Sequence, residues 1–169
     1  QPDIMTFAKG VASGLPMGIT TATPEVAASF KGLTLSTYGG NPISSVAALA
    51  TLHVMTREDI PGRAERLGGK LRAGLVALQD KHKLIGDVRG MGLMQGVELV
   101  EDRKTKEPAS KRANLLIESL RKKKLLIGKG GLYGNTLRIA PPMLVTEAQI
   151  DDALRLLDSA LYEVAAAQI

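Results

Sequence analysis

The chain switches repeatedly between two hydrophobic periods, and this alternation constrains its fold more than any other feature. Leucines recur with helical spacing at 67, 71, 75 and 78, and basic residues lie largely off that face. Short apolar runs typical of strands follow, at 84–89 and 93–100, with a glycine-rich connection between them. Helical and strand patterns that alternate along one chain indicate an α/β or α+β protein.

The end signals of the helices sharpen this prediction. Thr23-Pro24 and Asn41-Pro42 each pair an N-cap residue with proline at the first helical position, and Thr146 with Gln149 matches a capping box. Further elements are predicted from the apolar patterns: helices at 24–30, 42–55, from 61 or 62 past 78, at 110–124 (capped by Ser110) and from 146 past 164, and strands at 4–8, 19–22, 125–128 and 136–140. The strand at 4–8 and the helix at 42–55 are expected to be buried because they are mostly apolar.

Composition excludes several classes of protein. The 169 residues suggest one domain, or one domain plus part of another, and the absence of cysteine excludes disulfides, zinc fingers and a cysteine nucleophile. His53 and His82 lack neighbours with ligand spacing, so no metal site is expected. No apolar run approaches the roughly 18 residues of a membrane span. The first residues lack a signal-peptide pattern. The expected location is therefore the cytoplasm, without a membrane partner.

The net charge of +5 raises the possibility of a nucleic-acid partner. The basic run at 121–124, however, lies at the expected end of a helix, where cations suit the helix dipole. With only three tyrosines, two phenylalanines and no tryptophan, the chain has too few aromatic residues for a base-stacking platform. A basic RNA-binding module is therefore the third-ranked hypothesis, and no nucleic acid is expected.

Three residues are candidates for chemistry. Lys9 directly follows an apolar strand and precedes a glycine-rich loop, where desolvation would make its neutral amine a nucleophile. Thr37 precedes Gly39-Gly40 and a helix start, an arrangement that could bind phosphate. Arg138 alternates with apolar residues in a short strand and could hold a carboxylate bidentately.

Each candidate also has a purely structural interpretation. Lys9 could be a surface lysine at a strand end, Thr37 could form an ST-turn and N-cap without a ligand, and Arg138 could face solvent or make an ion pair. Arg89, which lies beside the glycines at 90 and 92, is expected to tie down a tight strand connection.

Four ordered segments together resemble one family. The sequences PDIMTFAKG and SGLPMG within 2–18, STYGGNP at 36–42, GDVRGMGLM at 86–94 and LRIAPP at 137–142 resemble the class III aminotransferases. These are pyridoxal-phosphate enzymes of fold type I. Within the family, the chain looks most similar to the mitochondrial-type alanine–glyoxylate aminotransferase group.

The resemblance implies a role for each candidate. Lys9 would bind pyridoxal phosphate through a Schiff base and then shuttle a proton. Thr37 would reach the cofactor phosphate of the neighbouring subunit, which implies a homodimer, and Arg138 would bind the substrate carboxylate. The implied reaction transfers an amino group between an amino acid or ω-amino acid and a 2-oxo acid such as pyruvate or glyoxylate.

The resemblance also implies that this chain is the C-terminal portion of a longer α/β enzyme. Residues 1–42 would be the end of the large cofactor-binding domain, and 43–169 would be a linking helix and an α+β small domain. The missing part would carry the groups that hold the phosphate, stack on the cofactor ring and protonate it, so the fragment alone is expected to be a poor catalyst. The rival hypothesis is a non-catalytic α/β module that acts through interaction or assembly.

Overall fold

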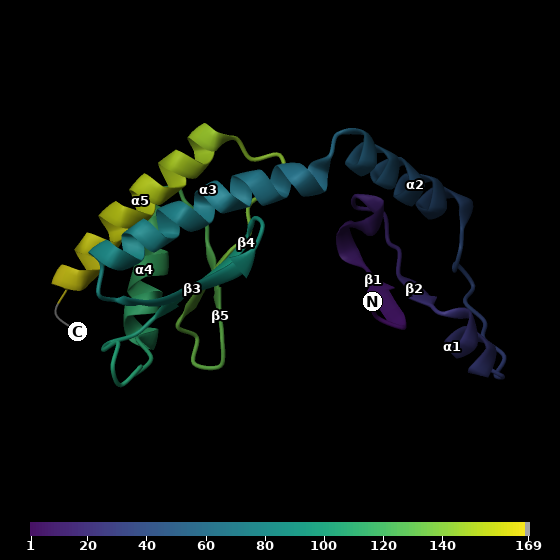
Figure 1. Cartoon of the computed structure of the whole chain (residues 1–169), viewed down its shortest axis with the longest axis horizontal. Helices are drawn as coiled ribbons and strands as arrows, with labels where there is room; N and C mark the ends of the chain where they lie inside the picture. The colour runs from purple at the N-terminus through teal and green to yellow at the C-terminus, as the bar shows by residue number, and fades with distance from the viewer. Residues whose placement is uncertain (168–169) are drawn as a thin grey trace. The chain divides into compact units, whose positions relative to one another are not determined.

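The computed structural model describes residues 1–167 and contains helices and strands in alternation (Figure 1). The chain divides into two compact units, one formed by Gln1–Ile60 and the other beginning at Pro61. The mixed α/β class predicted from the periodicities is confirmed. No helix within the described residues combines the length and the apolar character needed to cross a membrane.

The first unit contains one antiparallel strand pair and short helices. β1 (Ile4–Phe7) pairs with β2 (Ile19–Ala22), and the 3-10 helix η1 (Lys9–Ala12) follows β1 directly. Both predicted caps are confirmed. The Thr23 side chain accepts a hydrogen bond from the Val26 N–H at the start of α1 (Pro24–Ser29), and the Asn41 side chain caps α2 (Pro42–Arg57) through the Ser44 N–H.

Two burial predictions for this unit are wrong. All four residues of β1 are exposed, with Ile4 at 53% of its full exposure, and only Ser44 and Ala48 of α2 are buried. The apolar positions of α2 at 46, 49, 52 and 54 are all exposed. The physical reason is that α2 packs on η1 through one face, and no described segment of this unit covers its other faces. Apolar composition predicts which faces favour burial, but it does not supply the surface that covers them.

The second unit is a sheet with helices on one face. The sheet is antiparallel throughout, in the order β3-β4-β6-β5, and its strands are β3 (Ile85–Met91), β4 (Met94–Leu99), β5 (Gly128–Gly130) and β6 (Thr136–Ile139). Three helices share its core: α3 (Ile60–Lys81), α4 (Ser110–Lys122) and α5 (Glu147–Ala166). The registers pair Val88 with Val97 and Val97 with Leu137, so one face packs on the helices and the other carries polar residues.

Several local predictions in this unit are confirmed. All four leucines of the α3 stripe are buried, and Thr146 and Gln149 form the reciprocal capping box of α5. The β3–β4 turn packs closely on α3, because an ideal Cβ on Gly68 would lie 2.1 Å from the carbonyl carbon of Gly92. A glycine at position 68 is therefore required for this contact between helix and turn.

Two details differ from the sequence prediction. Ser110 is the first residue of α4 and not its cap, and its hydroxyl donates to the Tyr133 carbonyl. The N-cap residue is Ala109, and no side-chain hydrogen bond caps this helix end. The predicted strand at 125–128 begins only at Gly128. The reason is that Leu125 closes the helix, since its N–H donates to Leu120 O while Lys124, at φ 65°, donates to Arg121 O. This Schellman arrangement uses residues that would otherwise extend the strand.

Candidate active site

Lys9 begins the 3-10 turn that follows β1, and its backbone has an uncommon conformation. Its φ is 55°, in the left-handed region that residues other than glycine rarely adopt, and Ser13 at the end of the turn has φ 50°. Such conformations cluster at functional sites, because they place a side chain where regular structure would not. The Lys9 turn is therefore a candidate site on structural grounds as well as on sequence grounds.

The surroundings of Lys9 are open. Its side chain is exposed, and an ideal Cβ on Gly10 would meet no atom within 4 Å. The first unit therefore does not supply the desolvation expected for this amine. An exposed primary amine on an open turn fits a cofactor that bonds covalently to lysine, so the residues present are compatible with pyridoxal phosphate.

Thr37 lies in the turn that leads into α2, and its side chain is exposed. Asn41 is the cap of that helix, with 3.0 Å between Asn41 Oδ1 and the Ser44 nitrogen, and its Nδ2 donates to Tyr38 O. The interpretation of Thr37 as an N-cap is therefore wrong. Within the described residues the Thr37 hydroxyl makes no hydrogen bond, so it is available to a ligand near the positive end of the helix dipole.

Arg138 lies in β6 between the buried Leu137 and the half-buried Ile139, and its side chain is on the polar face of the sheet. Within residues 1–167 its guanidinium has no ion pair or hydrogen bond. The interpretation of Arg138 as a structural ion-pair residue is therefore not supported. Arg89 behaves as expected, because Nη1 binds Asp87 at 2.7 Å and Glu98 at 2.6 Å and thereby ties β3 to β4.

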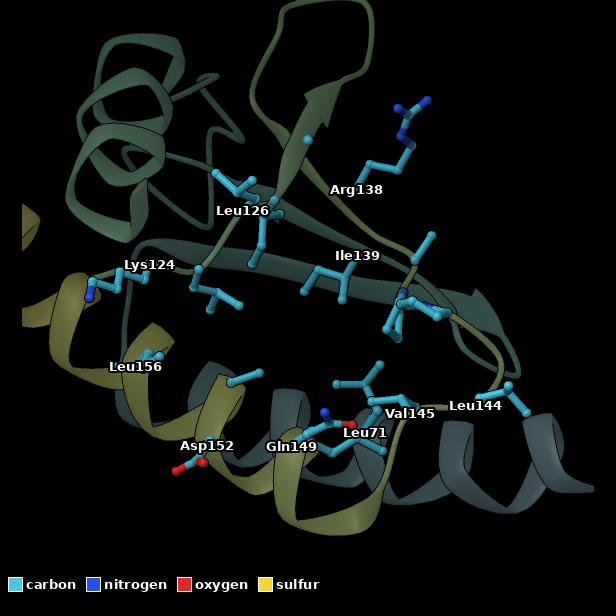
Figure 2. A pocket seen from close by; sticks show the side chains of 18 residues that line it. Leu71, Lys124, Leu126, Arg138, Ile139, Leu144, Val145, Gln149, Asp152 and Leu156 are labelled. Atoms are coloured by element: carbon cyan, nitrogen blue, oxygen red, sulfur yellow. The ribbon is translucent and has the colours of Figure 1, made fainter. Parts of the chain in front are cut away.

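A groove of about 760 Å³ borders Arg138 in the second unit (Figure 2). Its walls are mostly apolar and come from the segment before β5, the end of β6, and the start of α5. In Figure 2, Ile139 points toward Leu71 and Val145 across the groove, whereas the guanidinium of Arg138 projects away from it. Arg138 therefore borders the groove, but its guanidinium points out of it.

The three predicted site residues are divided between the two units. Lys9 and Thr37 belong to the first unit and Arg138 to the second. Each is described within its own unit, so the assembly of all three into one site stays a prediction. The domain boundary proposed at 42/43 also stays a prediction.

Sequence reasoning missed a polar cluster in the second unit that is built around a buried histidine. His82 is 5% exposed, its Nε2 lies 2.6 Å from Asp158 Oδ1, and its ring packs edge-on against Tyr162. Lys81 also binds Asp158, and this hydrogen bond is the main reason that the pKa of Asp158 lies below its usual range. No sequence signal pointed to this cluster, because 76 positions separate His82 from Asp158. The cluster joins α5 to the end of α3.

The other charged groups give no sign of a further site. Among residues 1–167, no group of three or more histidine, aspartate or glutamate side chains could hold a metal ion. In the basic run at 121–124, Arg121 pairs with Glu118 and Lys123 pairs with Glu163. The run is therefore partly neutralised, as expected for the solvated end of a helix.

Comparison with known proteins identifies the family. The model of the class III aminotransferase family matches residues 1–161, so the chain belongs to this family, whose members use pyridoxal phosphate. The chain is 42% identical over 164 residues to alanine–glyoxylate aminotransferase 2 homolog 2, mitochondrial, of Arabidopsis thaliana, covering 96% of this chain and 34% of the relative. It is 38% identical to the taurine–pyruvate aminotransferase of Bilophila wadsworthia, covering 97% of this chain and 39% of the relative.

Solved structures give the same result. An S-selective transaminase from an Arthrobacter species with alanine bound superposes with a TM-score of 0.88 at 34% identity. The match covers 99% of this chain and 39% of the transaminase chain. A phospholyase from Arthrobacter in complex with phosphoethanolamine reaches a TM-score of 0.91 at 31% identity, covering 99% and 40%. The chain therefore has the fold of one part of these enzymes. It spans 34–39% of the length of the two curated relatives named above.

Proposed function

We propose that this chain is the part of a class III aminotransferase that carries the cofactor lysine and the small domain. The observation that carries the proposal is Lys9, which is an exposed amine on a left-handed turn within the segment that matches the family. The proposed reaction moves an amino group between an amino acid or ω-amino acid and a 2-oxo acid of the pyruvate or glyoxylate type. The names of the alanine–glyoxylate and taurine–pyruvate relatives support these substrate classes.

Lys9 has two tasks in this proposal. Its Nζ would hold the cofactor covalently, and the same amine would take up and return a proton at the substrate Cα. Pyridoxal phosphate supplies the electron sink for this chemistry when it is bound. The open space beside Gly10 leaves room for a bulky group at the amine.

The other two residues orient ligands. The Thr37 hydroxyl has no partner within the described residues, and we infer that it donates to the cofactor phosphate of a neighbouring subunit in a homodimer. Arg138 carries an uncompensated guanidinium, which suits bidentate binding of the substrate carboxylate. We further propose that the chain alone is a poor catalyst, since the groups that tune the cofactor ring belong to the rest of the enzyme.

The location and the reaction type remain proposals of the same kind. We propose the cytoplasm. The name of the Arabidopsis relative includes the word mitochondrial, so cell fractionation of the source organism would decide between the two locations. The similarity to a phospholyase shows that this fold also occurs in an enzyme named for lyase chemistry. Release of inorganic phosphate from phosphoethanolamine, without amino transfer to pyruvate, would therefore contradict the proposed transamination.

Borohydride reduction with added pyridoxal phosphate, followed by peptide mapping, tests the central proposal. A pyridoxyl group concentrated on Lys9 is expected in the longer enzyme that contains this chain. Lys9→Arg should abolish that label, whereas Lys31→Arg, a change at an exposed lysine of the same unit, should leave it intact. Equal labelling of Lys9 and the surface lysines in the longer enzyme would refute the assignment and favour the rival, non-catalytic module.

A further inference from the structure

Arg138 belongs to a row of cross-strand neighbours in which the two residues beside it are both glycine. β4 places Gly96 opposite Arg138, β5 places Gly128 opposite it from the other side, and β3 places Arg89 opposite Gly96. Directly opposite residues point to the same face of a sheet. The polar face of this sheet therefore carries two arginines in one row, and neither strand beside Arg138 presents a side chain to it.

The absence of a side chain at Gly128 determines where the guanidinium lies. An ideal Cβ on Gly128 would be 3.5 Å from both Nε and Nη2 of Arg138 and 3.9 Å from Cζ. A single methyl group would thus make an ordinary van der Waals contact. A branched side chain would place further carbon atoms in the space that the guanidinium occupies, and would displace it.

The two arginines of the row differ in charge balance. Arg89 is bound by the carboxylates of Asp87 and Glu98. Arg138 has no carboxylate partner among the described residues. The residue opposite it on β4, Gly96, has no side chain that could cover the guanidinium. An anion that approaches this face is therefore attracted more strongly to Arg138 than to Arg89.

We propose that Gly128 is a specificity-determining residue that positions the Arg138 guanidinium for substrates bearing a carboxylate. The inference rests on the proposed function, in which Arg138 binds the substrate carboxylate. With no side chain at 128, the guanidinium lies across β5 and keeps its donors free for a bidentate pair. A branched residue at 128 weakens binding of carboxylate substrates and leaves amines without a carboxylate unaffected.

The test uses Gly128→Val in the longer holoenzyme, with Gly130→Val as the matched control. Gly130 lies on the same strand and the same face, and an ideal Cβ there would meet no atom within 4 Å. Gly128→Val should raise KM for an amino acid donor about tenfold or more, as expected for the loss of a charge-assisted hydrogen bond. The kcat of the same donor, and the kinetics of a primary amine without a carboxylate, should stay within about twofold of the wild type.

Gly128→Ala and Gly130→Val should both behave as the wild type. Their behaviour separates the displacement of Arg138 from a general loss of the β5–β6 hairpin. Equal KM values for Gly128→Val and Gly130→Val would overturn the inference. A KM that rises equally for the amine lacking a carboxylate would overturn it too, because the effect would then be structural.

A second readout distinguishes failure of this inference from failure of the proposed function. Acetate is titrated into the 169-residue chain at constant ionic strength, and the Nε–Hε resonance of Arg138, assigned with Arg138→Lys, is followed by NMR. Saturable shifts in the wild type and Gly130→Val that are lost in Gly128→Val support the inference even if the longer enzyme shows no transamination. Equal shifts in all three proteins, or no shift in the wild type, overturn it whatever the activity of the enzyme.

Discussion

Replacing each of two adjacent glycines of α3 by alanine should change the stability of the protein in opposite directions. Gly69 is exposed and an ideal Cβ there would meet nothing within 4 Å, so Gly69→Ala should stabilise the protein by about 1 kcal/mol through helix propensity alone. Gly68 gains the same propensity, but its Cβ would lie 2.1 Å from the carbonyl carbon of Gly92. The obstacle is backbone, which cannot rotate away as a side chain can.

The cost at Gly68 can be estimated from the contacts that must give way. Overpacking of this kind costs about 1–3 kcal/mol. Moving the turn also strains the bond from Gln95 Nε2 to Gly92 O, which is 2.7 Å long, and the loss of such a bond costs about 1 kcal/mol. After about 1 kcal/mol is regained from helix propensity, Gly68→Ala should destabilise the protein by about 1–3 kcal/mol.

Urea denaturation followed by circular dichroism measures both changes in the same chain. The unfolding midpoint should rise for Gly69→Ala and fall for Gly68→Ala, with a similar slope for both. In thermal unfolding, each kcal/mol of difference should separate the two midpoints by about 2–4 °C, as expected for a chain of this length. Stabilisation by both substitutions would refute the reasoning, because it would mean that the β3–β4 turn does not depend on close approach to α3.

Two further predictions concern α5. The pKa of Asp158 is lowered in the folded state mainly by the Lys81 hydrogen bond, so its contribution to stability is present above the unfolded pKa of about 3.9 and is lost as pH falls through the folded value. Asp158→Asn should therefore reduce the drop in urea midpoint between pH 5 and pH 3. The control Asp152→Asn changes an exposed carboxylate on the same helix and should not reduce this drop. Equal pH profiles for the wild type and Asp158→Asn would contradict the linkage. Thr146→Ala removes one half of the capping box and should lower the free energy of unfolding by about 1 kcal/mol in the same assay. Thr146→Ser should retain most of that stability. Identical midpoints for the alanine and serine variants would show that the cap contributes little.

Most helix positions and caps were predictable from the sequence because they depend on residues a few positions apart, with Ser110 of α4 as an exception. The cap of α2 at Asn41 and the capping box of α5 needed only the local order of polar residues, proline and apolar residues. The α3 stripe was predictable for the same reason. The start of β5 was not, because Leu125 could extend a strand or close a helix, and the αL conformation of Lys124 decides between them.

Burial was predictable only where the covering surface lies in the same unit. The α3 leucines are buried because the sheet and the other helices of the second unit cover them. The more apolar α2 is mostly exposed because η1 covers only one of its faces. Hydrophobic period describes what a segment can bury, whereas the packing partner decides what it does bury.

The two arginines of the polar sheet face separate what sequence and tertiary structure each determine. The sequence by itself determined that Arg89 and Arg138 lie in strands, that Lys9 follows a strand before a glycine-rich turn, and that the chain belongs with the class III aminotransferases. Only the tertiary structure decided that Arg89 is bound by two carboxylates while Arg138 is flanked by Gly96 and Gly128. The physical reason is that charge pairing and cross-strand space depend on residues that strand register brings together from distant parts of the chain.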